Sequence, residues 1–218
     1  MEKTTLVKDN SISYKLRVTE ELERKIRFLC TKSPNNEWSG ILIYDIEGSS
    51  KDKSFKVIAK DLYLMALGSA AYTEFQNNPD VITYMIEKGW VGCQTGLLHS
   101  HNTMATFFSG TDTSTLLDEG KDRNNFVSLI VNNAGKYTAA ITSKCNRIYS
   151  YKDTIKFFDK EDIVYENEKI EETIVIYNML DVTIEGNTFD LPELDDRFEE
   201  LKKIESTRPK SLVSPTGS

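Results

Sequence analysis

The sequence predicts one medium-sized α/β or α+β domain, either alone or with a small extension. Segments that alternate like strands and segments with helical periodicity follow one another along the chain. The nearly continuous apolar run ILIYDI is typical of a buried strand, and QTGLLHSH is predicted to form another central strand. With 218 residues, of which 39% are hydrophobic and 28% charged, the chain is long enough to bury a core and too apolar to be disordered throughout.

The first part of the chain predicts a strand, a helix and a hairpin, in that order. Residues 11–18 alternate as a strand does, and Thr19 is expected to cap the helix that follows. The segment SPNN should end this helix. A strand at 41–46, a polar turn and a second strand at 55–65 then form the hairpin. The apolar stripe of the helix consists of Leu22, Ile26, Leu29 and Cys30.

Short helices and strands continue to about residue 150. We expect a helix after Pro79, a strand at 94–101, a helix at 112–120 and a strand–turn–strand segment at 126–142. Together with the elements before them, they make up a predicted domain that covers residues 1–150.

Acidic residues become frequent after Tyr151. Residues 151–206 are therefore predicted to form an acidic C-terminal extension that ends in an amphipathic helix, ELDDRFEELKKIES. The simplest interpretation is a solvated face with one helix folded back on the core. The alternative is a helix that binds a partner or forms a homodimer. Residues 207–218 are expected to be a flexible tail.

Composition argues against several classes of protein. The net charge of −7 disfavours nucleic-acid binding, because contacts to phosphates need clustered Lys and Arg. No run approaches the ~20 apolar residues that span a bilayer, and the N-terminus lacks the apolar core of a secretory signal, so we expect a cytoplasmic protein without membrane contact. Three widely spaced cysteines without a CxxC pair favour free thiols over a disulfide framework or a cysteine-rich zinc site.

The only two histidines of the chain, His99 and His101, lie one residue apart in a predicted strand. Strand side chains alternate, so both imidazoles should point to the same side of the sheet and offer two nitrogen ligands to a metal ion. A catalytic zinc ion commonly has three protein ligands, one of them a carboxylate, and Asp112 at the start of the next helix is the natural third. Ser109 lies one turn before it, which gives the pattern H-x-H-x7-S-x-x-D.

Each part of this pattern also has an explanation that needs no metal. The histidines could bond to buried carbonyl groups, and Ser109 with Asp112 forms a capping box. The joint spacing, and the absence of histidine elsewhere, favour a zinc site. The chain has no HExxH motif, so the base that accepts a proton from water must come from a distant segment.

The pattern resembles that of the JAMM metalloproteases, also called the JAB or MPN-plus family, in their prokaryotic or phage form. In that family a Glu at the start of an early core strand accompanies the H-x-H-x7-S-x-x-D motif. Glu37 in NNEWSGILIYDI matches this Glu, and the similarity covers about residues 11–150. The resemblance implies an MPN/JAB-like fold with a central mixed β-sheet flanked by helices.

The resemblance also implies a role for each site residue. His99, His101 and Asp112 would bind Zn²⁺, Glu37 would act as general base on the zinc-activated water, and Ser109 would steady the oxyanion. The implied reaction is hydrolysis of a peptide or isopeptide bond in a protein substrate, such as deconjugation or processing of a ubiquitin-like tail. The chain departs from the family at Asn102 and Phe108, where Pro is frequent, so the substrate class is left open.

A second interpretation is a non-catalytic MPN-type scaffold or assembly protein. Scaffold members of the family have typically lost some of the ligands, whereas this chain keeps all of them. The intact set favours the enzyme.

Overall fold

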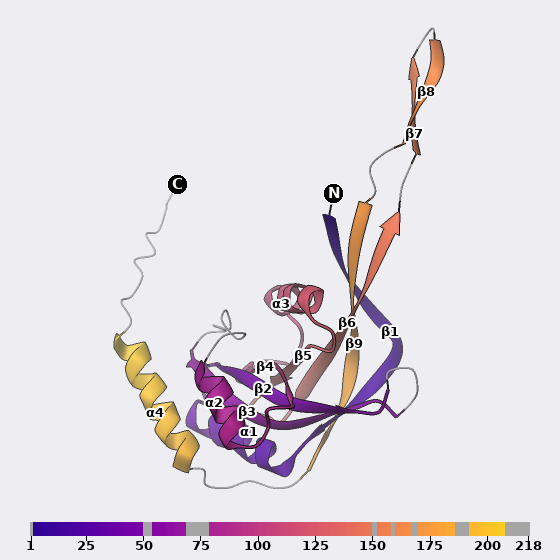
Figure 1. Cartoon of the computed structure of the whole chain (residues 1–218). Helices are drawn as coiled ribbons and strands as arrows, with labels where there is room; N and C mark the ends of the chain where they lie inside the picture. The colour runs from indigo at the N-terminus through magenta and orange to yellow at the C-terminus, as the bar shows by residue number, and fades with distance from the viewer. Residues whose placement is uncertain are drawn as a thin grey trace, which may run out of the picture.

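The computed structural model describes residues 2–49, 54–68, 79–149, 152–157, 160–166, 170–185 and 192–207. These residues contain nine strands and four helices (Figure 1). In chain order they are β1 (Glu2–Val18), α1 (Glu20–Lys32), β2 (Trp38–Glu47), β3 (Lys56–Leu67), α2 (Pro79–Glu87), β4 (Gln94–Ser100), α3 (Gly110–Asp122), β5 (Val127–Val131), β6 (Tyr137–Tyr149), β7 (Lys152–Phe157), β8 (Lys160–Glu166), β9 (Ile170–Ile184) and α4 (Pro192–Thr207).

Seven of the strands form a closed sheet in the order β1-β3-β2-β4-β5-β6-β9. β1 pairs in parallel with both β3 and β9, and β4 pairs in parallel with β5, whereas the remaining pairs are antiparallel. The sheet is therefore mixed, and with the four helices of the described residues it confirms the predicted α+β class.

Helix α1 covers the main core, as its apolar stripe predicts. Leu22, Ile26 and Leu29 are fully buried in one cluster with residues of the inner sheet face. The Thr19 side chain accepts a hydrogen bond from the N–H of Leu22 at 3.4 Å, which confirms the predicted cap. The helix ends at Lys32, and its C-cap residue Ser33 donates its N–H to the Leu29 carbonyl at 2.8 Å.

The opposite face of the sheet carries two smaller clusters. One gathers around β2 and α2. The other joins α3 to β4, β6 and the residue before β5 through Leu97, Leu116, Phe126 and Ala140. Helix α3 also contacts β9 and β1. Gly120 allows this close approach, because a Cβ atom there would lie only 2.5 Å from Val175 Cγ1.

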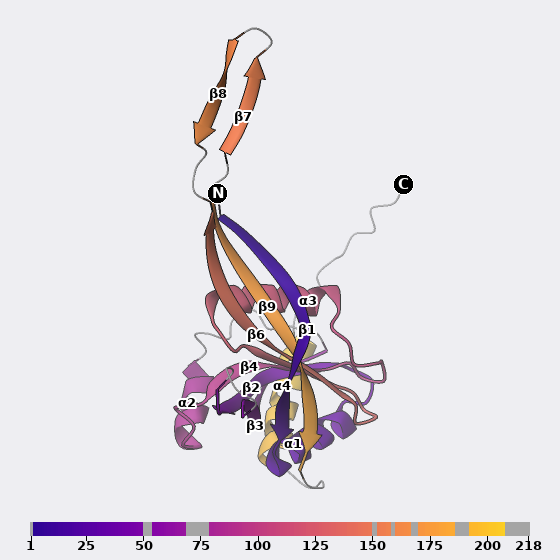
Figure 2. The same ribbon diagram turned by 90° about the vertical axis from the view of Figure 1, so that its right-hand side faces the viewer.

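The chain after residue 150 contributes both sheet and helix. β9 enters the sheet between β6 and β1, so it completes the closed sheet. β7 and β8 form a separate two-stranded ribbon beyond the ends of β6 and β9 (Figure 2). The sequence did not predict these three strands.

Helix α4 confirms the predicted terminal helix. It contacts β3, and Leu194, Phe198 and Leu201 are buried in the main core, so the helix folds back on the sheet. The predicted tail lies outside the described residues apart from Thr207, the last residue of α4. None of the helices in the described ranges is both long and apolar enough to cross a membrane.

A buried charged network joins α1, β3 and α2. Lys25 forms an ion pair with Asp61, which is fully buried. The Tyr84 hydroxyl donates to Asp61 Oδ2 at 2.6 Å and accepts from Lys25 Nζ at 3.1 Å. Burial raises the pKa of Asp61, while the charge of Lys25 and the hydrogen bonds act in the opposite direction.

Candidate metal centre

The two histidines lie where β4 ends, and the strand alternation brings both imidazoles to one face. His99 pairs with Ser39 of β2, and both histidines are buried. Ser100, between them, points to the other face, where its hydroxyl accepts a hydrogen bond from the Trp38 N–H at 3.0 Å. The arrangement agrees with the period of two expected for a strand.

The first turn of α3 presents Asp112 to the histidines. The structure confirms the predicted capping box: Asp112 N–H donates to Ser109 Oγ at 3.2 Å, and Ser109 N–H donates to Asp112 Oδ2 at 2.8 Å. The Ser109 hydroxyl also donates to Asp112 Oδ2, at 2.6 Å. The cap therefore fixes the position of the carboxylate.

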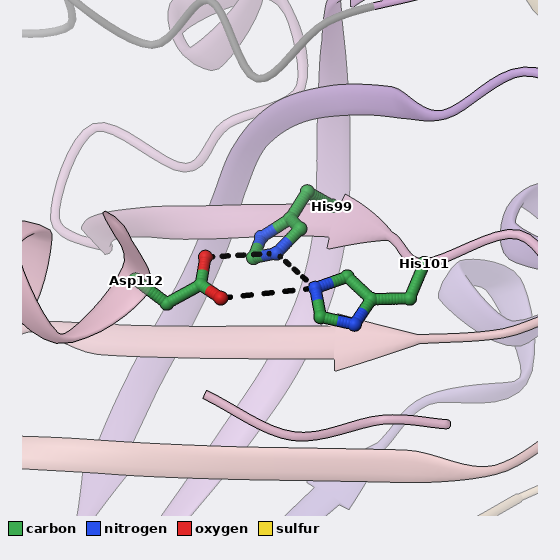
Figure 3. Close-up of side chains that lie close together, drawn as sticks. All are labelled: His99, His101 and Asp112. Carbon is green, nitrogen blue, oxygen red and sulfur yellow. Dashed lines mark hydrogen bonds and ion pairs between the residues drawn. The ribbon is translucent and has the colours of Figure 1, made fainter. Parts of the chain in front are cut away.

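His99, His101 and Asp112 form a compact buried group that could hold a metal ion (Figure 3). His99 Nε2 lies 3.1 Å from Asp112 Oδ1, and His101 Nε2 lies 3.7 Å from Oδ2. The two Nε2 atoms are 3.2 Å apart. Ligand atoms at about 2.0–2.1 Å from a tetrahedral ion are about 3.3 Å apart, so the spacing suits such an ion.

The Asp112 carboxylate is held in its charged form. Burial raises its pKa, but hydrogen bonds with His99 and Ser109 outweigh this effect and hold the pKa well below its usual range. An ionised carboxylate beside two imidazoles is a suitable donor set for a divalent cation.

The loop after β4 orients His101. Its Nδ1 lies 3.1 Å from the carbonyl oxygen of Ala105, so the Nδ1–H tautomer donates to this carbonyl and leaves the Nε2 lone pair facing the group. The Asn132 side chain donates to the Met104 carbonyl at 2.8 Å and thereby ties the loop to the turn after β5. Sequence reasoning missed Ala105 and Asn132, because a backbone acceptor leaves no signal in the sequence and NNAG indicates only a turn.

Glu37 lies directly before β2 and is not a member of the His-His-Asp group. It is half-buried, and its carbonyl accepts a hydrogen bond from Gly68 N–H at 2.6 Å. Glu37 precedes Ser39 by two residues, and Ser39 pairs with His99. The alternation of β2 places Ser39 on the side of the sheet that carries the histidines, and Glu37 lies one residue before this strand.

Two large apolar side chains of the loop are exposed beside the group. Phe107 is 54% exposed, and its ring stands edge-on to that of His101, with the centroids 5.5 Å apart. Met104 is 52% exposed. Phe108, in contrast, packs against the cluster beneath α3, so one of the two phenylalanines has a structural role.

Comparisons with known proteins give a structural similarity and no family match. No protein-family model and no curated protein matches the chain. Among solved structures, the chain is similar to protein DSY2949 from Desulfitobacterium hafniense, determined in solution, with a TM-score of 0.38 and 14% identity over 79% of this chain and 94% of that chain.

Proposed function

We propose that this chain is a zinc-dependent hydrolase of peptide or isopeptide bonds, with a metal centre and an MPN/JAB-like fold of the JAMM type. The observation that carries the proposal is the convergence of His99, His101 and Asp112, from the end of β4 and the first turn of α3, into one buried group. The chemistry of this donor set fits zinc, which favours two imidazoles with a carboxylate in catalytic sites.

A zinc ion bound there would supply Lewis-acid activation of water and of the scissile carbonyl group. Glu37 would accept the proton of the attacking water and pass it to the leaving amine. Its position two residues before Ser39, which pairs with His99, supports this role, which requires its side chain to reach the group. The Ser109 hydroxyl donates to Asp112 here, so it positions the ligand, and it must turn away from Asp112 to steady an oxyanion.

The proposed substrate is a protein with an extended tail, such as a ubiquitin-like protein. Phe107 and Met104 are exposed next to His101, and they offer an apolar surface on which such a tail could lie. The net charge of −7 favours partners with basic or mixed charge.

A non-catalytic assembly module of the MPN type is the second candidate. Among the described residues, the side chain of Glu37 has no hydrogen bond or ion pair with His99, His101 or Asp112, and an assembly module needs no such base.

Metal content tests the centre itself. We expect about one zinc ion per chain in protein purified without chelators, and loss of tight binding in His99→Ala and Asp112→Ala. Folded protein with no transition metal above background would refute the proposal.

The Glu37→Gln variant separates the enzyme from the assembly module. It removes the proton acceptor but keeps the size of the side chain, so turnover should fall by roughly 10²-fold or more while the metal stays bound. Glu47→Gln, an exposed change at the other end of β2, is the matched control and should keep full activity. Wild type and both variants are incubated with Gly-Gly-tailed ubiquitin-like fusions. Equal cleavage by Glu37→Gln and wild type would contradict the base assignment, and intact substrate with metal-loaded wild type would favour the assembly module.

A further inference from the structure

A serine hydroxyl and a histidine nitrogen are buried without hydrogen-bond partners on neighbouring strands at the His-His-Asp group. Ser39 of β2 pairs with His99 of β4, and these residues are 1% and 3% exposed. Neither Ser39 Oγ nor His99 Nδ1 makes a hydrogen bond. Buried polar atoms are nearly always paired in folded proteins, so two such atoms on paired residues require an explanation.

The Nδ1 atom of His99 determines what its other nitrogen can do. His99 Nε2 is the atom that faces Asp112 and His101 (Figure 3). If Nε2 is to offer its lone pair to a cation, the ring proton must be on Nδ1, and a buried Nδ1–H needs an acceptor. His101 has such an acceptor in the Ala105 carbonyl, whereas His99 has none.

Ser39 is the polar side chain that flanks His99 in the sheet. On the other side of β4, His99 pairs with Ile130, which is buried and apolar. Directly paired residues of antiparallel strands point to the same face, with Cβ atoms about 4.5–5.5 Å apart. Rotation about the Cα–Cβ bond of Ser39 moves its hydroxyl between staggered positions, so the hydroxyl can approach the neighbouring imidazole.

We infer that Ser39 is a positioning residue of the metal centre, whose hydroxyl accepts the Nδ1–H of His99 and thereby directs the Nε2 lone pair toward the ion. The inference rests on the proposed metal binding by His99, and it assigns to Ser39 the function that the Ala105 carbonyl has for His101. Loss of such a partner typically weakens metal binding by 10–100-fold.

Ser39→Ala is the test, and Ser128→Ala is its matched control. Ser128 is also 1% exposed, and its hydroxyl is also buried without a partner, but it pairs with Leu97 and not with a ligand. The affinity of each purified protein for Zn²⁺ is measured by competition with a chelator. We expect 10–100-fold weaker binding for Ser39→Ala and wild-type affinity for Ser128→Ala.

The two histidines allow a direct measurement in the intact wild-type protein. With only two imidazole side chains, the ring nitrogens give four signals in a ¹⁵N NMR spectrum of the Zn²⁺-loaded protein. His99 should show the Nδ1–H tautomer with slow proton exchange, and Ser39→Ala should lose this slow exchange. This measurement in the wild type also decides the question if Ser39→Ala does not fold.

Three outcomes would overturn the inference while leaving the proposed function standing. They are equal Zn²⁺ affinity in wild type and Ser39→Ala, equal weakening by Ser128→Ala, and a His99 Nδ1 proton that exchanges rapidly in the loaded wild type. Failure of the wild type to bind Zn²⁺ would instead overturn the proposed function and, with it, the role of Ser39.

Discussion

Replacing Gly120 with Ala should weaken both the fold and the metal centre, because α3 packs closely on the sheet at this residue. The new Cβ atom would lie 2.5 Å from Val175 Cγ1 and 3.1 Å from Thr142 Cβ. Carbon atoms in ordinary contact are about 3.5–4.0 Å apart, so Val175 and α3 must move apart by about 1 Å. Val175 is fully buried, and overpacking of this kind costs about 1–3 kcal/mol.

Gly110→Ala in the same helix is the matched control. A Cβ atom at Gly110 meets no other atom within 4 Å. Gly110 is the first residue of α3, so Ala gains less helix propensity there than the about 1 kcal/mol of an interior residue such as Gly120. A lower unfolding free energy for Gly120→Ala than for Gly110→Ala therefore reports the collision, and we expect a difference of about 1–3 kcal/mol.

Urea unfolding in the presence of a chelator measures this difference without a contribution from bound metal. Because Asp112 lies in the first turn of the same helix, an outward shift of α3 should also weaken Zn²⁺ binding by Gly120→Ala. Equal unfolding midpoints and slopes for the two variants would refute the proposed close packing of α3.

Two further predictions concern buried titratable groups. Lys25→Met leaves the buried Asp61 carboxylate without its cation and should cost about 3–5 kcal/mol at pH 7. Burial raises the pKa of Asp61, so lowering the pH protonates its carboxylate in the folded state. In urea unfolding, the variant should therefore lose less unfolding free energy relative to wild type at pH 5 than at pH 7. An equal loss of unfolding free energy at both pH values would argue against a charged Asp61. Burial raises the pKa of Cys30 to about 11, so only about one thousandth of it is thiolate at pH 8, and iodoacetamide should label the exposed Cys145 first. Mass spectrometry of the native protein checks this order, and early labelling of Cys30 would contradict it.

The parts of the fold that could be predicted are those with a strong local pattern. The stripe and cap of α1 agree with the structure because a helix concentrates its signal within one segment. The positions of His99 and His101 on one face follow from strand alternation alone, and the orientation of Asp112 follows from the capping box.

The parts that could not be predicted depend on partners far away in the chain. The segment IEETIVIYNMLDVTI contains charged residues, and it is a strand because it pairs with β1 and β6. β1 begins at Glu2 and not near residue 11 for the same reason, since its polar first residues pair with β9. The position of Glu37 came only from a family resemblance, and the structure places it directly before β2, where it shares no hydrogen bond or ion pair with the two histidines.

The pairing of β1 with β9 has a consequence for how the protein reaches its native state. Leu6 of β1 pairs with Val175 of β9, so the closed sheet depends on contacts between residues that are made early and late in synthesis. Such a topology has a high contact order and should fold slowly. Until β9 has left the ribosome, β1 and β6 lack a shared neighbour and expose strand edges that can pair with other chains. The three residues of the metal centre, His99, His101 and Asp112, are synthesised before β9. At that stage helix α3 cannot pack through Gly120 against Val175, because Val175 belongs to β9. The metal centre should therefore mature only after β9 has been translated.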